Sequence, residues 1–322
     1  MNKVGFVFPG QGSQYVGMGR DVYESSAAAR RVFRKADKVL GFSLSKLCFE
    51  GPAEQLNDTQ YAQPAILTVS VAQLEALHEK WSKEGVTIEP EYVAGHSLGE
   101  YTALVAVGSI SFEDALRLVW ERGRLMKEEG ERRPGGMAAV IGLSTETLED
   151  VVEQASAEGS VVIANSNTPF QTVISGEIEA LLTAMDLARQ EGAAKVARLA
   201  VSIASHSPLM QQAGEQLGKF LEGIKFTDPL VPLVANITGQ ALTTAEEIKR
   251  ELSDQLIKPV AWVASISSMM ESGVGTFIEV GPGQVLSGLI KRISDEVSVL
   301  KGEDLIVGEG HNGDALPAGS SS

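Results

Sequence analysis

The sequence predicts an α/β fold in which a small lobe is inserted into a larger domain built on a β-sheet. A short apolar strand, a glycine-rich turn and a helix follow one another at residues 4–40 and again at residues 92–107. Residues 137–201 show the element order β-α-β-β-α-β, which matches the ferredoxin-like motif. The length of 322 residues is long for one compact domain and suits a main body with an additional lobe.

Composition narrows the class of protein. The 27 basic and 42 acidic residues give a formal net charge of −15, which argues against non-specific nucleic-acid binding because that depends on basic residues. A hydrophobic content of 43% allows a sizeable core, and no apolar run is long enough to span a membrane. The single Cys48 lies in an apolar run and is expected to be a buried thiol. With no secretory signal at the N-terminus, we expect a cytoplasmic protein.

The chain begins with a predicted buried strand at residues 4–8. The loop that follows, residues 9–14, contains two glycines and could bring backbone N-H groups close to a ligand. Loops at the carboxyl ends of strands are where open α/β sheets bind ligands, although a plain strand-to-helix turn is the alternative. Helical patterns follow at residues 25–40 and 64–81.

Residues 92–107 read as strand, sharp turn and helix, with Ser97 in the turn. Gly95 and Gly99 on either side allow the tight backbone that exposes a nucleophilic serine in a nucleophile elbow. The following helix directs free N-H groups and the positive end of its dipole toward the place where an oxyanion would form. The pattern favours acyl transfer, and the alternative is a glycine-rich turn with an ordinary serine.

Ser111 is predicted to cap the next helix, with a capping-box spacing to Asp114. Arg122 falls on the apolar face of this helix, with no carboxylate nearby on the same stripe. It could extend to solvent or pair with a distant acid. The alternative is that its guanidinium binds a substrate carboxylate through two hydrogen bonds.

A glycine- and charge-rich stretch at residues 130–136 suggests a boundary between the main body and the lobe. We therefore expect a discontinuous catalytic domain at residues 1–130 and 201–300, interrupted by the lobe at residues 131–200. The predicted lobe elements are a strand at 137–141, a helix at 145–157, strands at 161–164 and 172–175, a helix at 177–190 and a strand at 195–201.

His206 is the candidate general base, on a loop just before a helix that Ser207 is predicted to cap. It is chosen by elimination among the four histidines of the chain. His78 lies among charged residues, His96 points away from the serine within the elbow, and His311 is in the C-terminal tail. A histidine that is buried or caps a helix for structural reasons is the alternative.

The last predicted strand, residues 276–280, ends in Gly281-Pro282-Gly283 and leads into a helix carrying Lys291 and Arg292. This basic pair is unusual in an acidic chain, and it could simply stabilise the helix C-terminus. From residue 301 to residue 322 periodicity vanishes, so a disordered tail is expected. The sequence contains no metal-ligand cluster and no Walker-type phosphate loop.

Five motifs in order resemble those of malonyl-CoA:acyl carrier protein transacylases, over about residues 3–295. They are Phe8-Pro9-Gly10-Gln11-Gly12-Ser13-Gln14, Gly95-His96-Ser97-Leu98-Gly99-Glu100-Tyr101, Arg122-Gly123, Ser205-His206 and Glu279-Val280-Gly281-Pro282-Gly283. The resemblance implies a hydrolase-like body with a doubly wound parallel sheet, an inserted ferredoxin-like lobe, and a site in the cleft between them.

The resemblance also implies a role for each matching residue. It makes Ser97 the nucleophile, His206 its base and Arg122 the ligand of the malonyl carboxylate. The remaining implied roles are backbone donors of the oxyanion hole for Gln11 and Leu98, orientation of the histidine through a main-chain carbonyl for Gln255, and docking of the acidic carrier protein for Lys291 and Arg292.

The implied function is transfer of malonyl from malonyl-CoA to the phosphopantetheine thiol of acyl carrier protein, in a monomer with no cofactor of its own. Leu98 fits the malonyl-type pattern, whereas Ser205 replaces the phenylalanine of many malonyl-selective members. A serine thioesterase or esterase with the same elbow is the alternative, and a catalytically silent docking module is a third possibility.

Overall fold

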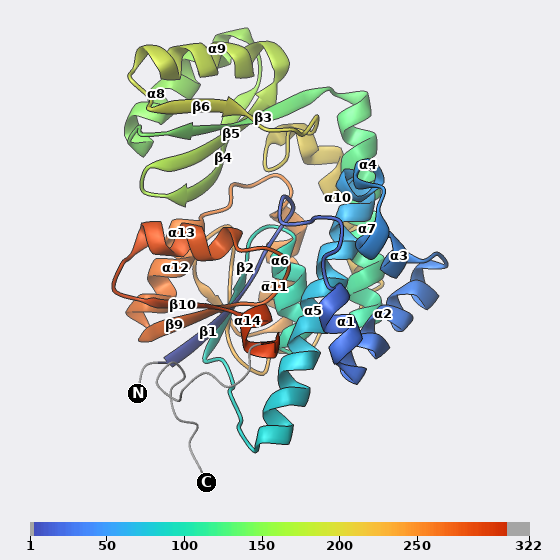
Figure 1. The fold of residues 1–322 in the computed structure, drawn as a ribbon. Helices are drawn as coiled ribbons and strands as arrows, with labels where there is room; N and C mark the ends of the chain where they lie inside the picture. The colour runs from blue at the N-terminus through green and yellow to red at the C-terminus, as the bar shows by residue number, and fades with distance from the viewer. Residues whose placement is uncertain (1–2, 308–322) are drawn as a thin grey trace.

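A computed structural model describes residues 3–307, which form two β-sheets with helices packed around them (Figure 1). The larger sheet is parallel apart from its last strand, which pairs antiparallel with its neighbour. In spatial order its strands are β10 (Ser298–Lys301), β9 (Val274–Glu279), β1 (Lys3–Phe8), β2 (Tyr92–Gly95), β7 (Leu233–Val234) and β8 (Ala241–Leu242).

Helices cover both faces of this sheet (Figure 1). Along β1, Phe6 and Phe8 pack into the large core that includes α5, whereas Val7 packs into a second core with residues of α12 and α13. The continuous apolar run of β1 follows from this burial on both faces. The helices of the main body are α1 (Arg20–Ser25), α2 (Ala27–Leu40), α3 (Leu44–Glu50), α4 (Ala53–Asn57), α5 (Thr59–Glu84), α6 (Gly99–Ala106), α7 (Phe112–Arg132), α10 (Gln211–Glu222), α11 (Ala245–Asp254), α12 (Trp262–Glu271), α13 (Val285–Ile293) and α14 (Gly302–Val307).

The second sheet forms a separate lobe, at the top of Figure 1, near the carboxyl ends of the parallel strands. Its antiparallel strands lie in the order β4 (Val161–Thr168), β5 (Gln171–Glu177), β3 (Gly135–Ile141) and β6 (Lys195–Arg198). Helices α8 (Thr145–Ala155) and α9 (Ile178–Gln190), with a 3₁₀ turn at Ser156–Glu158, pack on this sheet and share a core with it. The element order is the expected β-α-β-β-α-β.

The lobe is joined to the main body by hydrogen bonds at the end of β4. The Ser166 N-H donates to the carbonyl of Val260 at 2.9 Å, and the Val260 N-H donates to the carbonyl of Ala164 at 2.8 Å. The side chains of His96 and Asn167 add a contact of 2.8 Å between Nε2 and Oδ1. These contacts fix the lobe directly above the turn that carries Ser97.

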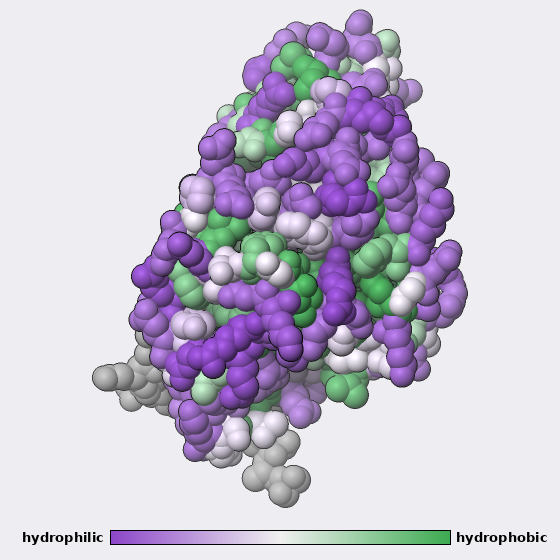
Figure 2. All heavy atoms as spheres, turned by 90° about the vertical axis from the view of Figure 1, so that its right-hand side faces the viewer, coloured by the Kyte–Doolittle hydropathy of each residue, from purple (hydrophilic) through white to green (hydrophobic). Residues whose placement is uncertain are grey.

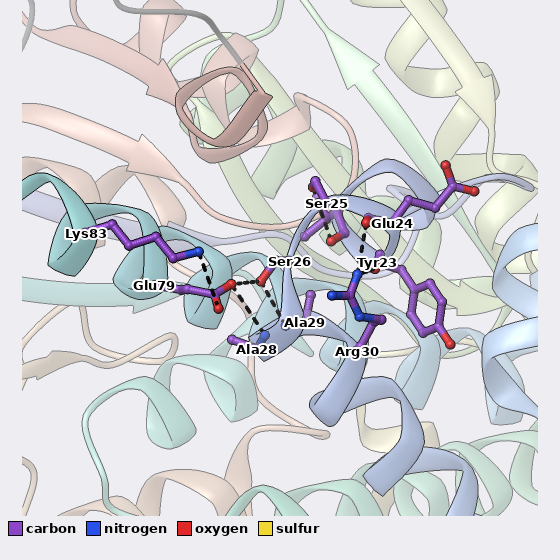
Figure 3. A network of polar contacts seen from close by, with 10 residues as sticks. Tyr23, Glu24, Ser25, Ser26, Ala28, Ala29, Arg30, Glu79 and Lys83 are labelled. Atoms are coloured by element: carbon purple, nitrogen blue, oxygen red, sulfur yellow. Dashed lines mark hydrogen bonds and ion pairs between the residues drawn. The ribbon is translucent and has the colours of Figure 1, made fainter.

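The helix expected at residues 25–40 is present as α2, and Ser26 separates it from the short helix α1, which was not foreseen (Figure 3). The Ser26 hydroxyl accepts from the Ala29 N-H at 3.1 Å and lies 2.6 Å from the carboxylate of Glu79, which belongs to α5. Lys83 pairs with the same carboxylate at 3.6 Å. The capping serine therefore starts α2 and links it to the long helix beneath.

The ends of two strands in the lobe differ from the sequence prediction, because a strand ends where its pairing with a neighbouring strand ends. The strand expected at 161–164 continues to Thr168, since β5 pairs with it that far through two irregularities. The strand expected at 195–201 ends at Arg198, where pairing with β3 stops. The short strands β7 and β8 and helices α11 and α12 were not foreseen.

The expected tail from residue 301 is wrong in its first residues. Lys301 ends β10, and Gly302–Val307 form α14. Leu305 is buried in the main core, and its carbonyl accepts from Lys80 of α5 at 2.7 Å. The apolar residues in this stretch explain why it packs. The remainder of the expected tail, with His311, lies outside the described residues.

On the face at the right of Figure 1, hydrophilic side chains predominate over the described residues, and apolar residues form small groups between them (Figure 2). Across residues 3–307, no helix combines the length and the apolar character that a membrane crossing requires.

Candidate active site

Ser97 lies in a tight turn between β2 and α6, with a φ of 50° that a residue with a side chain seldom adopts. Gly95 and Gly99 permit this turn. A Cβ on Gly95 would lie 2.0 Å from the carbonyl carbon of Gly99, and one on Gly99 would lie 2.0 Å from the carbonyl oxygen of Phe8. The expected strand, turn and helix are therefore present, and the two glycines are required by close backbone approach.

The Ser97 hydroxyl contacts His206 at 2.9 Å between Oγ and Nε2. On the other side of the ring, Nδ1 lies 2.8 Å from the carbonyl oxygen of Gln255 and 3.1 Å from that of Lys258. Because two carbonyl oxygens face Nδ1, this nitrogen carries the hydrogen and donates it, which leaves Nε2 to accept from the serine. Carbonyl groups thus orient the imidazole, as the resemblance implies for Gln255.

His206 is buried, with 3% of its surface exposed, and its φ of 57° lies in the left-handed region. Burial, followed by the positive charge of Arg122, lowers the pKa of His206 to about 3. The imidazole is therefore neutral at physiological pH and can accept a proton. Ser207, as expected, caps the next helical segment by accepting from the Leu209 N-H, and a 3₁₀ turn at Pro208–Met210 precedes α10.

Arg122 is almost fully buried and lies beside the serine. Its Nη2 donates to Oγ of Ser97 and to Oε1 of Gln255, each at 3.1 Å, and its Nη1 donates to Oε1 of Gln63 at 2.8 Å. Its Nε has no hydrogen-bond partner, and no ion pair joins Arg122 to any carboxylate of the described residues. A buried cation held only by neutral groups suits an anionic ligand.

Two backbone amides lie near the serine without a protein acceptor in the described part of the chain, those of Gln11 and Leu98. Gln11 lines the cavity next to the serine, and Leu98 begins α6 directly after Ser97. The Gln11 side chain accepts from Thr59 at 2.8 Å, and Thr59 accepts from Gln63 at 3.0 Å. Since Gln63 also accepts from Arg122, a chain of hydrogen bonds connects the loop of Gln11 with the arginine.

A cavity of about 510 Å³ opens between the main body and the lobe and reaches Ser97, His206 and Arg122. Its polar lining from the lobe includes Asn165, Asn167 and Gln171. Its apolar lining consists of Met126, Met137, Val173, Leu199, Ala200, Val201, Ile203, Val285, Leu286 and Leu289. The cavity therefore has one charged end at the serine and walls that are largely apolar.

Sequence reasoning missed Asn236 and Gln63. Asn236 Oδ1 accepts from the Ser97 N-H at 2.7 Å, and its Nδ2 donates to the Gly95 carbonyl at 2.7 Å. It follows β7 at the same edge of the sheet as the elbow, so a polar residue after an apolar strand was the available signal. Gln63 is fully buried within α5, where a polar residue among apolar ones gave a weaker signal.

The remaining residues predicted from the sequence lie outside the site around Ser97. Lys291 and Arg292 are exposed at the end of α13 and do not line the cavity. His78 is about half exposed and pairs with Glu75, as expected for a surface histidine. Cys48 is buried, which raises the pKa of its thiol to about 12. Among residues 3–307 no cluster of three or more His, Cys, Asp or Glu side chains is suited to a metal ion.

Comparison with known proteins agrees with this geometry. A family model described as acyl transferase domain matches residues 5–312, and the chain belongs to this family of acyltransferases. Among its curated relatives is the malonyl CoA-acyl carrier protein transacylase of Bacillus subtilis (strain 168), which is 44% identical over 305 residues, 94% of each chain. The malonyl resemblance seen in the sequence is thereby confirmed.

Two solved structures are also similar. One is the malonyl CoA-acyl carrier protein transacylase of Coxiella burnetii, with a TM-score of 0.90 and 39% identity over 95% of this chain and 96% of that one. The other is a malonyl-transacylase in complex with its type II PKS acyl-carrier protein. The match there has a TM-score of 0.88 and 41% identity, and covers 93% of this chain and 95% of that one.

Proposed function

We propose that this enzyme transfers a malonyl group from malonyl-CoA to the phosphopantetheine thiol of an acyl carrier protein, through an ester on Ser97. The observation that carries the proposal is the contact of 2.9 Å between Ser97 Oγ and His206 Nε2, beside a buried Arg122 that has no carboxylate partner in the described structure. The names of the relatives and the carrier protein bound to a similar enzyme support the same reaction.

In the first half-reaction, Nε2 of His206 takes the hydroxyl proton as Oγ of Ser97 attacks the thioester carbonyl. The resulting oxyanion is stabilised by the free N-H groups of Gln11 and Leu98, a type of contact worth roughly 3–4 kcal/mol in barrier height. The C–S bond then breaks, coenzyme A leaves as a thiol with the proton from His206, and malonyl-Ser97 remains.

In the second half-reaction, His206 takes the proton of the phosphopantetheine thiol, and the sulfur attacks the ester carbonyl. The ester C–O bond breaks, and Ser97 regains its proton from His206. The carbonyl oxygens of Gln255 and Lys258 keep the imidazole in one tautomer through both steps.

Arg122 gives the selectivity for malonyl. Its Nε is unpaired and its guanidinium lines the cavity, so a malonyl carboxylate next to Ser97 would supply the missing anionic partner. An acyl group without a carboxylate would leave the buried charge of Arg122 uncompensated. Such an acyl group is therefore transferred more slowly than malonyl.

The group that accepts the acyl chain distinguishes this function from the thioesterase or esterase alternative. In the proposed function the acyl-enzyme is attacked by a thiol of the carrier protein, and in the alternative it is attacked by water. All of the relatives compared are named as transacylases or malonyltransferases, which favours transfer. A catalytically silent docking module would have no need for the aligned Ser97 and His206.

We further propose that Lys291 and Arg292 contact the acidic carrier protein, since both are exposed cations on α13, whose first turn lines the cavity.

The chain would act as a cytoplasmic monomer without a cofactor of its own. Its two parts correspond to a hydrolase-like body at 1–130 and 201–300 and a ferredoxin-like lobe at 131–200, a division supported by the separate sheets and cores.

The test is incubation with radiolabelled malonyl-CoA, followed by addition of holo acyl carrier protein. Label is expected first on the enzyme, through Ser97, and then on the carrier protein. Rapid release of free malonate, with no label on the carrier, would support hydrolysis instead. Methylmalonyl-CoA and acetyl-CoA in parallel reactions measure the acyl selectivity.

A further inference from the structure

Glu100 is a fully buried carboxyl group on the side of Ser97 that does not line the cavity. It is the second residue of α6, and no Lys, Arg or His of the described residues forms an ion pair with it. One carboxylate oxygen accepts from the Asn236 N-H at 3.0 Å, and the other accepts from Nε2 of Gln255 in a short hydrogen bond. The reaction described above assigns it no role.

These two partners hold the reacting residues. Asn236 accepts the Ser97 N-H at 2.7 Å, and Gln255 Nε2 donates to the Ser97 carbonyl at 3.0 Å. Gln255 also accepts from Arg122 through Oε1 at 3.1 Å and from His206 through its main-chain carbonyl at 2.8 Å. Glu100 therefore contacts both residues that position the serine, the histidine and the arginine.

The orientation of the Gln255 amide is decided by what lies on each side of it. Its Oε1 faces the guanidinium of Arg122, which can only donate, and its Nε2 faces Glu100 and the Ser97 carbonyl, which accept. A carboxylate accepts on both oxygens, so it satisfies Asn236 and Gln255 together. A neutral amide at position 100 would set an NH₂ group against one of these two donors.

We infer that Glu100 is a positioning residue for acyl transfer, whose carboxylate fixes the Gln255 amide so that Arg122 and His206 face Ser97. It acts on His206 only through Gln255, whereas many serine enzymes place a carboxylate directly against their histidine. This inference rests on the proposed function, because it assumes that Ser97, His206 and Arg122 act together.

Opposing effects act on the charge of Glu100. Burial, followed by the charge of Glu251, raises the pKa of Glu100 well above its ordinary value, whereas the hydrogen bonds from Gln255 and Asn236 lower it. The case for a carboxylate at this position is therefore geometric, because both of its oxygens face N-H donors and neither faces an acceptor of the described residues.

The variant that tests this is Glu100→Gln, with Glu129→Gln as its matched control. Glu129 is a buried carboxyl group on α7 that accepts from Nη2 of Arg132 at 2.6 and 2.7 Å and has no hydrogen bond to the residues that contact Glu100. Glu100→Gln should lower kcat for malonyl transfer at least 10-fold and also lower the ratio of malonyl to acetyl transfer. Glu129→Gln should keep both within about 3-fold when the two variants have similar Tm values.

A folded Glu100→Gln protein with wild-type kcat and wild-type acyl selectivity would overturn the inference. If Glu100→Gln does not fold, Glu100→Asp takes its place, because the shorter carboxylate cannot reach both donors at once. A folded Glu100→Asp protein with unchanged kcat would be equally decisive against it.

A second readout separates this inference from the proposed function. The rate at which a fluorophosphonate probe labels Ser97 requires neither malonyl-CoA nor carrier protein. It should fall at least 10-fold in Glu100→Gln and stay near wild type in Glu129→Gln. Wild-type enzyme that reacts with the probe but transfers no malonyl would refute the proposed function, and the labelling rates would still decide the role of Glu100.

Discussion

Oγ of Ser97 lies 2.9 Å from Nε2 of His206, although the two residues are separated by 109 positions in the chain. Both have positive φ values, 50° and 57°, and among the described residues they are the only non-glycine residues that do. Such a conformation costs of order 1–3 kcal/mol and persists only where the surrounding structure enforces it. Over residues 3–307, the left-handed backbone strain of non-glycine residues is therefore confined to the two residues that would react.

Replacement of the nucleophile or the base should abolish most of the activity. Ser97→Ala should form no acyl-enzyme, and His206→Ala should lower kcat/KM for malonyl transfer by roughly 10³–10⁴-fold, because no other group can take the hydroxyl proton. Radiolabelled malonyl-CoA measures both effects. Labelled protein recovered from Ser97→Ala in wild-type yield would show that another residue is the nucleophile.

Arg122→Ala should change the choice of acyl group. Loss of a charge-assisted contact worth about 1.5–3 kcal/mol should lower kcat/KM for malonyl-CoA roughly 10- to 100-fold, with a smaller effect for acetyl-CoA. The control is Arg124→Ala on the same helix, whose guanidinium pairs with Glu121 and Glu128 at the surface. If the ratio of kcat/KM for malonyl-CoA to that for acetyl-CoA is unchanged in Arg122→Ala, Arg122 does not bind the malonyl carboxylate.

Gly95→Ala and Gly99→Ala should each destabilise the protein by several kcal/mol, since either Cβ would come within about 2 Å of backbone atoms. Gly218→Ala in α10 is the matched control, because a Cβ there meets nothing within 4 Å. It should be neutral or raise stability by about 0.5–1 kcal/mol through helix propensity. Urea unfolding measures all three, and a stable Gly99→Ala protein would contradict the close packing of the turn.

His206 should make stability depend on pH. Its pKa is about 3 in the folded protein and near 6.5 when exposed, so below pH 6.5 the unfolded chain binds the proton more strongly. Above pH 6.5, burial of the neutral His206 does not make the free energy of unfolding depend on pH. As the pH falls from 6.5 toward 3, the free energy of unfolding decreases by up to about 1.4 kcal/mol per pH unit.

His206→Gln should flatten this part of the pH dependence, whereas His78→Gln, at an exposed site, should leave it as in the wild type. Free energies of unfolding at pH 5.0 and pH 6.5 give the comparison. An identical difference between the two pH values in wild type and His206→Gln would mean that the buried histidine is not held neutral.

Charge reversal of both Lys291 and Arg292 to Glu should raise KM for the carrier protein about 10-fold and leave acylation by malonyl-CoA unchanged. The two cations lie outside the cavity, so the first half-reaction does not involve them. The double variant Arg34→Glu with Lys46→Glu, at exposed sites on α2 and α3, gives the same change in net charge and is the control. A carrier KM that stays at the wild-type value would place docking elsewhere.

Much of this site could be read from the sequence because it depends on local chemistry. The turn around Ser97 requires Gly95 and Gly99, and the apolar stripe of α7 places Arg122 on the buried side. Both features arise within a few residues along one strand or one helix. The order of elements in the lobe was correct for the same reason.

The residues that the sequence did not reveal act across long separations. Asn236 reaches the Ser97 N-H from the end of β7, and Glu100 reaches Gln255 at the end of α11. The lengths of β4 and β6 were also misjudged, since a strand ends where its partner ends. Helix α14 was missed because a short segment packs only when a core already exists for Leu305.

By itself the sequence determined the order of the elements in the lobe, the reactive turn at Ser97 and the identity of the candidate base. Only the tertiary structure decided how these groups meet: the tautomer of His206, the neutral partners of Arg122 and the burial of Glu100. Local backbone and side-chain preferences operate over a few residues, whereas hydrogen bonds and burial depend on groups that folding brings together from distant parts of the chain.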